Sequence, residues 1–231
     1  VSTRSNLLLD ARRAHNKLEV QVHKKCILLS EPNEEMYAAF AELQKIPILK
    51  TPQDSITVAP GGVIGDTHFK RNFIEENNGE FYLVSAFNQI SILSKERYAE
   101  LNKSHSKNIQ AGAFGENIQT EGLLDIESLP QGTVLQFGDT AQIKITHLRT
   151  YCYKFANVLF PTVEEFFYWK KHAMGRPIDR IGVIGQVVCE GIILPYDPIS
   201  IVYKPIDHVN LGYVQRPHGV ASRTLITKDQ L

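Results

Sequence analysis

The chain has 231 residues, and its 25 lysines and arginines balance 25 aspartates and glutamates, so the formal net charge is zero. This balance argues against nucleic acid as a partner, because binding to a phosphate backbone needs a surplus of cations. No apolar run reaches the roughly 18 residues of a transmembrane helix, so a membrane-spanning protein is not expected either.

The cysteine content indicates a compartment. The chain has 3 cysteines, an odd and small number that does not suit a disulfide framework and favours a reducing environment. The first residues also lack the apolar core of a secretory signal. We therefore expect a cytoplasmic protein.

The first half of the chain predicts strands and short helices separated by turns. In chain order we expect a strand over 18–29, a helix over 34–43, an irregular segment over 47–60, a glycine-rich turn over 61–66 and strand signals over 81–93. Ser94 then suits the N-cap of a short helix that runs to about Leu101.

The second half predicts the centre of a sheet. Residues 134–137 and 141–147 read as a hairpin around Gly138 and Asp139, with glycine suited to the first position of a type II′ turn. Thr162–Glu165 matches a capping box that opens a helix to about residue 171. The apolar run 181–189 predicts a central strand, and 199–203 the last strand of the core.

These elements predict a mainly β fold. Many short strands, frequent glycine turns and three short helices favour a β-barrel with a few peripheral helices, since barrel closure removes exposed strand edges. The pattern alone also fits a sandwich. We expect residues 1–204 to form a single domain and residues 205–231 to form a C-terminal extension that packs on it or trails from it.

Cys152 is the strongest candidate for chemistry. The residues before it, 143–148, alternate apolar and polar, and strand parity places Cys152 on the polar face together with Lys144. Arg149 and Lys154 bracket the thiol, and nearby cations favour the thiolate form. Although most single cysteines are structural, this setting predicts a thiolate that could bind a metal or cofactor.

The other two cysteines are expected to be packed core thiols. Cys26 shares strand parity with four aliphatic residues, and Cys189 ends a valine-rich run. The three cysteines are widely scattered, and neither a CxxC nor an HExxH pattern occurs, which argues against a zinc site.

A cysteine–histidine dyad is the alternative enzyme reading of Cys152. His147 lies five residues away, and this odd spacing puts the two side chains on opposite faces of a regular strand unless a bulge intervenes. His68 or His172 could approach through the fold, which the sequence leaves open.

Glycine-rich turns and arginines supply possible anion contacts. Residues 61–66 and 112–117 are each punctuated by glycines, which can expose backbone amides toward an anion or a ring edge. Neither turn matches a phosphate-binding P-loop or a dinucleotide fingerprint, and each could be an ordinary turn. Arg176 and Arg180, around a Gly-Arg-Pro segment, could bind an anion or lie on the surface.

The order of these features is similar to that of one known family. Gly-Asp-Thr-His at 65–68, Ile-Ser-Ile-Leu-Ser at 90–94, the segments 112–117 and 120–122, and finally Cys152 follow one another as in the MOSC domain. This domain takes its name from the C-terminal part of molybdenum cofactor sulfurases. The resemblance covers about 56–203, and its most specific part is Phe114–Asn117 together with the strand before Cys152. It implies a β-barrel core with peripheral helices.

The resemblance also implies a cofactor site. Cys152 matches the cysteine that ligates molybdenum in the reductases of the family, and a thiolate is a soft ligand suited to such a metal. Basic side chains and exposed amides should hold the phosphate of the molybdenum cofactor (molybdopterin). The implied cofactor-binding residues are Gly115, Glu116, Asn117, Arg149, Lys154, Arg176, Arg180, Asp66 and His68. The last two could instead fix their turn.

The activity that the resemblance implies is the molybdenum-dependent reduction of N-hydroxylated small molecules. Since the chain has no clustered cysteines for an iron–sulfur module, a reductase of this kind would need a separate electron-donor protein. The segment before Cys152 departs from many small bacterial members because it contains no proline, so its backbone could differ. Two alternatives stay open: a non-catalytic cofactor or sulfur carrier, and a MOSC fold that has lost the cofactor.

Overall fold

The structure is a computed structural model of the chain. It describes residues 32, 34, 37, 38, 41, 50–66, 69, 73–77, 79–86, 89–123, 125–149, 156–165, 167, 180–212 and 221–226. The chain forms two compact units, of which the smaller comprises Val1–Leu49, Glu100–Gly115 and Tyr151–Asp179. The larger comprises Lys50–Ala99, Glu116–Thr150 and Arg180–Leu231. The expected domain boundary at residue 204 stays a prediction.

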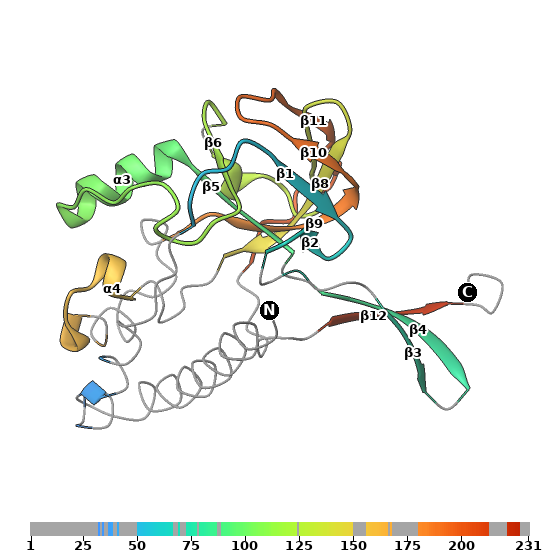
Figure 1. Ribbon diagram of the computed structural model, residues 1–231, viewed down its shortest axis with the longest axis horizontal. Helices are drawn as coiled ribbons and strands as arrows, with labels where there is room; N and C mark the ends of the chain where they lie inside the picture. The colour runs from blue at the N-terminus through green and yellow to red at the C-terminus, as the bar shows by residue number, and fades with distance from the viewer. Residues whose placement is uncertain are drawn as a thin grey trace. The chain divides into compact units, whose positions relative to one another are not determined.

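A curled six-stranded sheet is the centre of the larger unit (Figure 1). Its strands, in spatial order, are β11 (Ile199–Tyr203), β7 (Val134–Phe137), β8 (Ala141–Leu148), β9 (Val183–Cys189), β5 (Ile90–Ser94) and β6 (Ile118–Thr120). Only the β5–β6 pair among these described strands is parallel. The mainly β prediction is therefore confirmed, and the run at 181–189 indeed forms a central strand.

The hydrophobic core lies on one face of this sheet. In β8 the residues with odd numbers from Ala141 to His147 are buried and the even-numbered ones are half-buried, as the alternating sequence predicts. Ile143 and Ile145 are fully buried, and β5 is buried along its whole length. β5 is nevertheless not a continuous apolar run, because Ser91 and Ser94 are buried with it; the Ser91 hydroxyl is hydrogen-bonded to Asn117 and the Ser94 hydroxyl to the Arg97 amide.

The hairpin of β7 and β8 forms as expected, with a longer turn than a type II′ connection. Phe137 pairs with Ala141, so three residues connect the strands. Gly138 has φ of 56° and begins the connection. The positive φ favours glycine at this position, and a β-carbon there would also lie within 3.0 Å of the Asp197 carboxylate, which would have to move.

A small three-stranded sheet contains part of the segment that was expected to be irregular. β1 (Ile56–Ala59) pairs with β10 (Gly191–Ile193) and with β2 (Gly62–Val63). The prediction of a loop or irregular edge over 47–60 is therefore wrong for its last residues, where the β-branched run Ile56–Val58 pairs with β10 despite the prolines and polar residues around it. The glycine-rich turn is real: Gly61 has φ of 121° at the tip of the β1–β2 hairpin.

A second three-stranded sheet joins the C-terminal extension to the expected strand region 81–93. That region divides into β4 (Glu80–Ala86) and β5, and β4 pairs with β3 (Phe73–Asn77). β12 (Ala221–Ile226) pairs with the other edge of β4. The extension beyond residue 204 thus contributes a strand of its own.

The helices begin where the sequence supplies caps. α3 (Lys95–His105) starts after Ser94, whose hydroxyl accepts a hydrogen bond from the Arg97 amide at 3.1 Å. In the smaller unit the Glu165 amide bonds the Thr162 hydroxyl at 3.2 Å, as the capping box predicts. The described residues of the expected helix at 34–43 are helical, and α4 (Ala156–Leu159) was not predicted.

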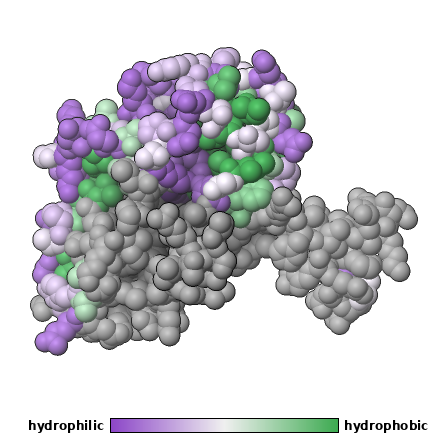
Figure 2. Space-filling model, in the orientation of Figure 1, coloured by the Kyte–Doolittle hydropathy of each residue, from purple (hydrophilic) through white to green (hydrophobic). Residues whose placement is uncertain are grey.

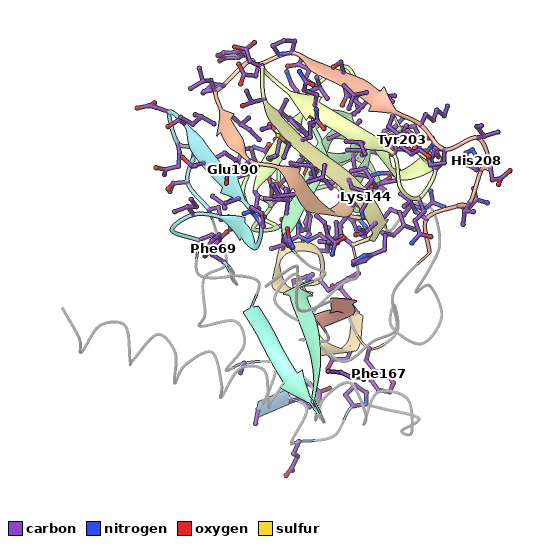
Figure 3. All side chains as sticks on the ribbon, turned by 90° about the vertical axis from the view of Figure 1, so that its right-hand side faces the viewer. Phe69, Lys144, Phe167, Glu190, Tyr203 and His208 are labelled. Carbon is purple, nitrogen blue, oxygen red and sulfur yellow. The ribbon has the colours of Figure 1, made fainter. Side chains whose placement is uncertain are left out.

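Apolar side chains are exposed on β9, on β10 of the small sheet, on β11 and in the segments that follow β10 and β11. Val188, Ile192, Leu194, Tyr196, Ile201, Val202, Tyr203, Ile206 and Val209 are all exposed, and part of this surface is green in Figure 2. Figure 3 shows Tyr203 and His208 in this region. The pairing of the edge strand β11 shifts register between Ile201 and Tyr203, and Lys204 and Pro205 follow. An irregular edge, a charge and a proline all disfavour pairing with a strand of another chain.

Cys189 corrects one of the cysteine predictions. Its thiol is free and exposed, so the expected core position is wrong. The pairing of β8 with β9 shifts register here: Gln142 pairs with Cys189 but Ile143 pairs with Val187, which leaves Val188 as an extra residue. This bulge ends the inward alternation after Val187. Cys26 lies outside the described residues.

Gly182, just before β9, has the closest β-carbon clash of the described glycines. Its φ is 89°, and a β-carbon there would lie within 3.0 Å of the Ile92 carbonyl oxygen on β5. We expect Gly182→Ala to lower the free energy of unfolding by more than about 2 kcal/mol, because it adds left-handed strain to a backbone clash.

Gly212→Ala is the matched control, since a β-carbon at Gly212 would meet no atom within 4 Å. Urea unfolding followed by circular dichroism measures both variants. Equal midpoints for the two variants would contradict this account of Gly182.

Candidate functional site

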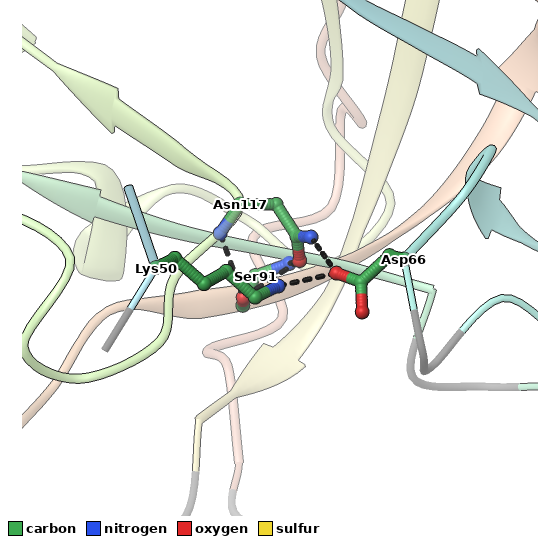
Figure 4. A network of polar contacts seen from close by, with 4 residues as sticks. All are labelled: Lys50, Asp66, Ser91 and Asn117. Atoms are coloured by element: carbon green, nitrogen blue, oxygen red, sulfur yellow. Dashed lines mark hydrogen bonds and ion pairs between the residues drawn. The ribbon is translucent and has the colours of Figure 1, made fainter. Parts of the chain in front are cut away.

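Two of the predicted site residues, Asp66 and Asn117, lie in one polar network (Figure 4). Asn117 Nδ2 donates to Asp66 Oδ2 at 2.7 Å, and Lys50 forms an ion pair with the same carboxylate oxygen. Asn117 Oδ1 accepts hydrogen bonds from the Ser91 amide and the Ser91 hydroxyl, each at 2.9 Å. The Asn117 amide in turn bonds the Ser91 carbonyl oxygen at 2.9 Å.

This network ties three segments together. Ser91 is on β5, Asn117 enters β6, and Asp66 follows the glycine-rich turn after β2. Because both lone pairs of Asn117 Oδ1 are used within the protein, only one N–H of its side-chain amide is left for a pterin edge. The described contacts of Asp66 therefore match the alternative role, that of fixing the turn. His68 lies outside the described residues.

Glu116 and Gly115 also serve local structure. Glu116 is 5% exposed, and its Oε1 accepts a hydrogen bond from the Tyr98 hydroxyl at 2.8 Å. Gly115 has φ of 62°, and its amide bonds the Gly112 carbonyl oxygen at 2.8 Å. The glycine at 115 is thus required by the backbone angle, whether or not a ligand is present.

Arg149 and Arg180 are brought together by the antiparallel pair β8–β9. Arg149 directly follows the end of β8, and Arg180 precedes the start of β9 by three residues. The Arg149 amide donates to the Gly182 carbonyl oxygen at 2.9 Å, which joins the two segments. Both arginines are half-buried at the same end of the pair.

Arg180 carries a buried donor that has no acceptor in the part of the chain that the structure describes. Its Nε is shielded from solvent and makes no hydrogen bond to another described residue. A buried guanidinium nitrogen without an acceptor lowers the stability of the folded state. The free-energy penalty is larger for an unsatisfied charged donor than for an unsatisfied neutral donor. This orphan donor suits an external acceptor such as a phosphate oxygen.

Cys152, Lys154 and Arg176 lie outside the described residues, so their predicted roles stay predictions. The strand before Cys152 does contain a bulge. Ile145 pairs with Gly185 but His147 pairs with Ile184, which leaves Thr146 as an extra residue. After the bulge both His147 and Leu148 are buried, so strand parity cannot be carried from Lys144 to position 152.

Two residues that organise this end of the sheet were missed. Glu127, in the short 3-10 helix η1 (Ile126–Ser128), accepts a hydrogen bond from the Gly182 amide at 2.7 Å. Arg97 on α3 donates to Glu127 Oε2 from Nε at 3.0 Å and also from Nη2. Glu127 sits in a loop and Gly182 in an apolar run, and no local pattern connects residues 55 positions apart.

His147 is a buried, neutral imidazole. It is 6% exposed, and burial lowers its pKa from 6.5 to about 4. The Thr146 hydroxyl donates to the Ile184 carbonyl oxygen, so its oxygen accepts from His147 Nδ1 at 2.9 Å. This assigns the proton of the neutral ring to Nδ1.

The described residues contain neither a membrane-spanning helix nor a cluster of metal ligands. No helix of the described chain is long and apolar enough to cross a membrane. Among the same residues, no group of three or more His, Cys, Asp or Glu side chains is placed to hold a metal ion.

Comparison with known proteins decides the family, since residues 75–200 match the model of the MOSC domain. The chain belongs to the MOSC domain family. The match covers more than half of the sequence and spans the six-stranded sheet from β5 to the start of β11. MOSC domains are generally associated with molybdenum cofactor, and the family prediction made from the ordered motifs is confirmed.

Solved structures resemble the MOSC chain in fold. YiiM from Escherichia coli has a TM-score of 0.50 at 20% identity, and the match covers 69% of this chain and 68% of that one. The YuaD protein from Bacillus subtilis has a TM-score of 0.49 at 18% identity, with 66% and 86% covered. Among curated proteins, none matches the chain.

His147 makes the stability of the MOSC chain depend on pH. The unfolded chain binds a proton at this site below about pH 6.5, whereas the folded chain does so only near pH 4. The neutral His147 therefore contributes fully to the free energy of unfolding above pH 6.5. As the pH falls to 4, the free energy of unfolding decreases by about 3 kcal/mol at this site.

His147→Gln should flatten this dependence between pH 6.5 and 4. His208→Gln, which removes an exposed imidazole, should leave it unchanged. Urea unfolding at several pH values measures the slope. A wild-type slope retained in His147→Gln would rule out His147 as its source.

Proposed function

We propose that this MOSC protein binds molybdenum cofactor at the end of β8 and β9 and reduces N-hydroxylated small molecules. The observation that carries the proposal is the buried Arg180 Nε, which has no acceptor among the described residues, in a segment whose Gly182 is hydrogen-bonded to the Arg149 amide, in a chain of this family. Two guanidinium groups at one end of a strand pair fit the phosphate of the pterin. The described residues are therefore compatible with the cofactor.

Each basic residue has a distinct position in this proposal. Arg180 and Arg149 come from the two strand ends and would bind the phosphate from both sides. Lys154 and Arg176 would add charge from the segment between these strands. Cys152, three residues beyond Arg149, would ligate molybdenum as a thiolate. When bound, the cofactor supplies the two-electron exchange that no side chain of the protein can perform.

The reaction balances as a two-electron reduction. An N-hydroxylated substrate takes up two electrons and two protons, its N–O bond breaks, and the products are the N–H compound and water. The electrons must come from a separate donor protein, because the chain has no cysteine set for an iron–sulfur cluster. A reducing, cytoplasmic location would keep Cys152 available as a thiolate.

A carrier role is the second candidate. The family includes domains that belong to cofactor sulfurases, and the Arg149–Arg180 site would bind the cofactor equally well without turnover. Cofactor binding is common to both roles, whereas only the reductase requires a substrate and an electron donor.

Metal analysis of the purified protein tests cofactor binding. Protein made in a host that synthesises the cofactor should contain about one molybdenum atom per chain, because a thiolate is a suitable soft ligand. Cys152→Ser should lose the metal, and Arg180→Gln should retain about tenfold less, since a charge-assisted contact to phosphate is lost.

Cys189→Ser is the matched control, because it removes a free, exposed thiol at the end of β9. It should keep the wild-type metal content. Wild-type protein without molybdenum from such a host would overturn cofactor binding in either role.

Turnover separates the reductase from the carrier. Molybdenum-loaded protein with a reduced viologen dye should convert hydroxylaminopurine or an amidoxime into the corresponding N–H compound, because the dye replaces the donor protein. Product formation measured by chromatography should fall to background in Cys152→Ser. A fully loaded protein that forms no product with either substrate is a carrier.

A further inference from the structure

Glu127 is a buried carboxylate that joins the Arg97 side chain to the Gly182 backbone amide. Its side chain is 3% exposed, and Arg97 neutralises it through Nε and Nη2. The other carboxylate oxygen, Oε1, accepts the hydrogen bond of the Gly182 amide at 2.7 Å. Burying a carboxylate is costly unless it is paired and hydrogen-bonded, so this arrangement is held together as a unit.

The Gly182 peptide is held from three sides. Glu127 binds its amide, the Arg149 amide binds its carbonyl oxygen at 2.9 Å, and the β5 backbone at Ile92 leaves no room for a β-carbon. With φ of 89°, Gly182 departs from the extended conformation that β9 begins one residue later. Because Gly182 lies outside the β9 ladder, its amide hydrogen bond goes to the Glu127 side chain and not to a neighbouring strand.

The two arginines are attached to this peptide. Arg180 lies two residues before Gly182, and Arg149 is hydrogen-bonded to it. Any shift of the Gly182 peptide would move the backbone from which both guanidinium groups extend. Sub-ångström placement matters for a bidentate anion contact, because charge-assisted hydrogen bonds weaken quickly with poor geometry.

We propose that Glu127, held by Arg97, is a positioning residue that fixes the Gly182 peptide and thereby the anion-binding arginines Arg149 and Arg180. The inference rests on the phosphate site of the proposed function. It assigns to α3 and η1, which carry Arg97 and Glu127, a task in the site that no pattern in the sequence indicates.

A purely structural ion pair is the competing explanation. Replacing a buried ion pair by apolar side chains is often neutral for stability, so stability alone does not explain a carboxylate here. The two explanations differ in what Glu127→Gln does. The amide cannot accept from Arg97 and Gly182 at once without placing its own N–H groups against a donor. Positioning therefore predicts a local change at Gly182 and Arg149.

The test uses the full chain without cofactor and inorganic phosphate as the probe. Amide hydrogen exchange and a phosphate titration are both followed by NMR. In Glu127→Gln, we expect the Gly182 and Arg149 amides to exchange about tenfold faster and phosphate to bind about tenfold more weakly. Arg97→Lys keeps a positive charge but loses the two-nitrogen contact of the guanidinium with Glu127, so it should give smaller increases in exchange and smaller losses of phosphate affinity. This variant can be measured even if Glu127→Gln does not fold.

Glu96→Gln is the matched control. Glu96 Oε1 accepts the Gly122 amide at 2.7 Å, so the variant disturbs an equivalent carboxylate–glycine bond elsewhere in the unit. It should leave exchange at Gly182 and the phosphate affinity unchanged. Unchanged exchange and affinity in Glu127→Gln, even with reduced stability, would show a structural ion pair and overturn the proposal.

The phosphate site itself is judged separately by wild-type protein and Arg180→Gln. If wild type binds phosphate and Arg180→Gln does not, the site stands, and the Glu127→Gln affinity tests the positioning. If wild type shows no phosphate binding, the anion site of the proposed function fails. The exchange rates at Gly182 and Arg149 then decide alone whether Glu127 fixes this peptide.

Discussion

The close approach of Gly182 to the β5 backbone is the constraint on which the larger unit depends. Because Ile92 presses against Gly182, only glycine fits, and its backbone leaves the extended conformation. The Gly182 amide then needs a side-chain acceptor, which Glu127 provides, and the buried Glu127 in turn needs a cation, which Arg97 provides. One backbone contact thus accounts for a buried ion pair that would otherwise be unexplained.

The elements that could be predicted are those governed by local rules. Apolar alternation predicted β7 and β8, a continuous apolar run predicted β9, and the hydroxyls of Ser94 and Thr162 predicted helix starts. The β1 strand was missed because prolines and polar residues flank its short β-branched run, and because its partners are β10, more than a hundred residues away, and a two-residue strand. Pairing energy of this kind is not visible in a window of sequence.

Two bulges explain where periodicity stops being informative. An extra residue at Val188 turns Cys189 outward from a run that looks fully buried, and an extra residue at Thr146 ends the parity argument before Cys152. The bulge at Thr146 lies opposite Gly185, and an isolated glycine inside a strand is a signal for such a bulge, whereas the residues from Val187 to Glu190 include no glycine or proline. The family was therefore better predicted by the order of the motifs than by the geometry inferred for each of them.

The motif residues divide into two physical roles. Asp66 and Asn117 satisfy each other together with Ser91 and Lys50, and a polar network with such complete internal bonding fixes the relative positions of β5, β6 and the glycine-rich turn. Arg180 is the opposite case, because its buried Nε has no acceptor among the described residues. A buried network that is satisfied specifies structure, whereas a buried charge that is unsatisfied points to a ligand. The phosphate site proposed above rests on this donor at the end of β8 and β9, whereas Asn117 and Asp66 hold β5, β6 and the glycine-rich turn together.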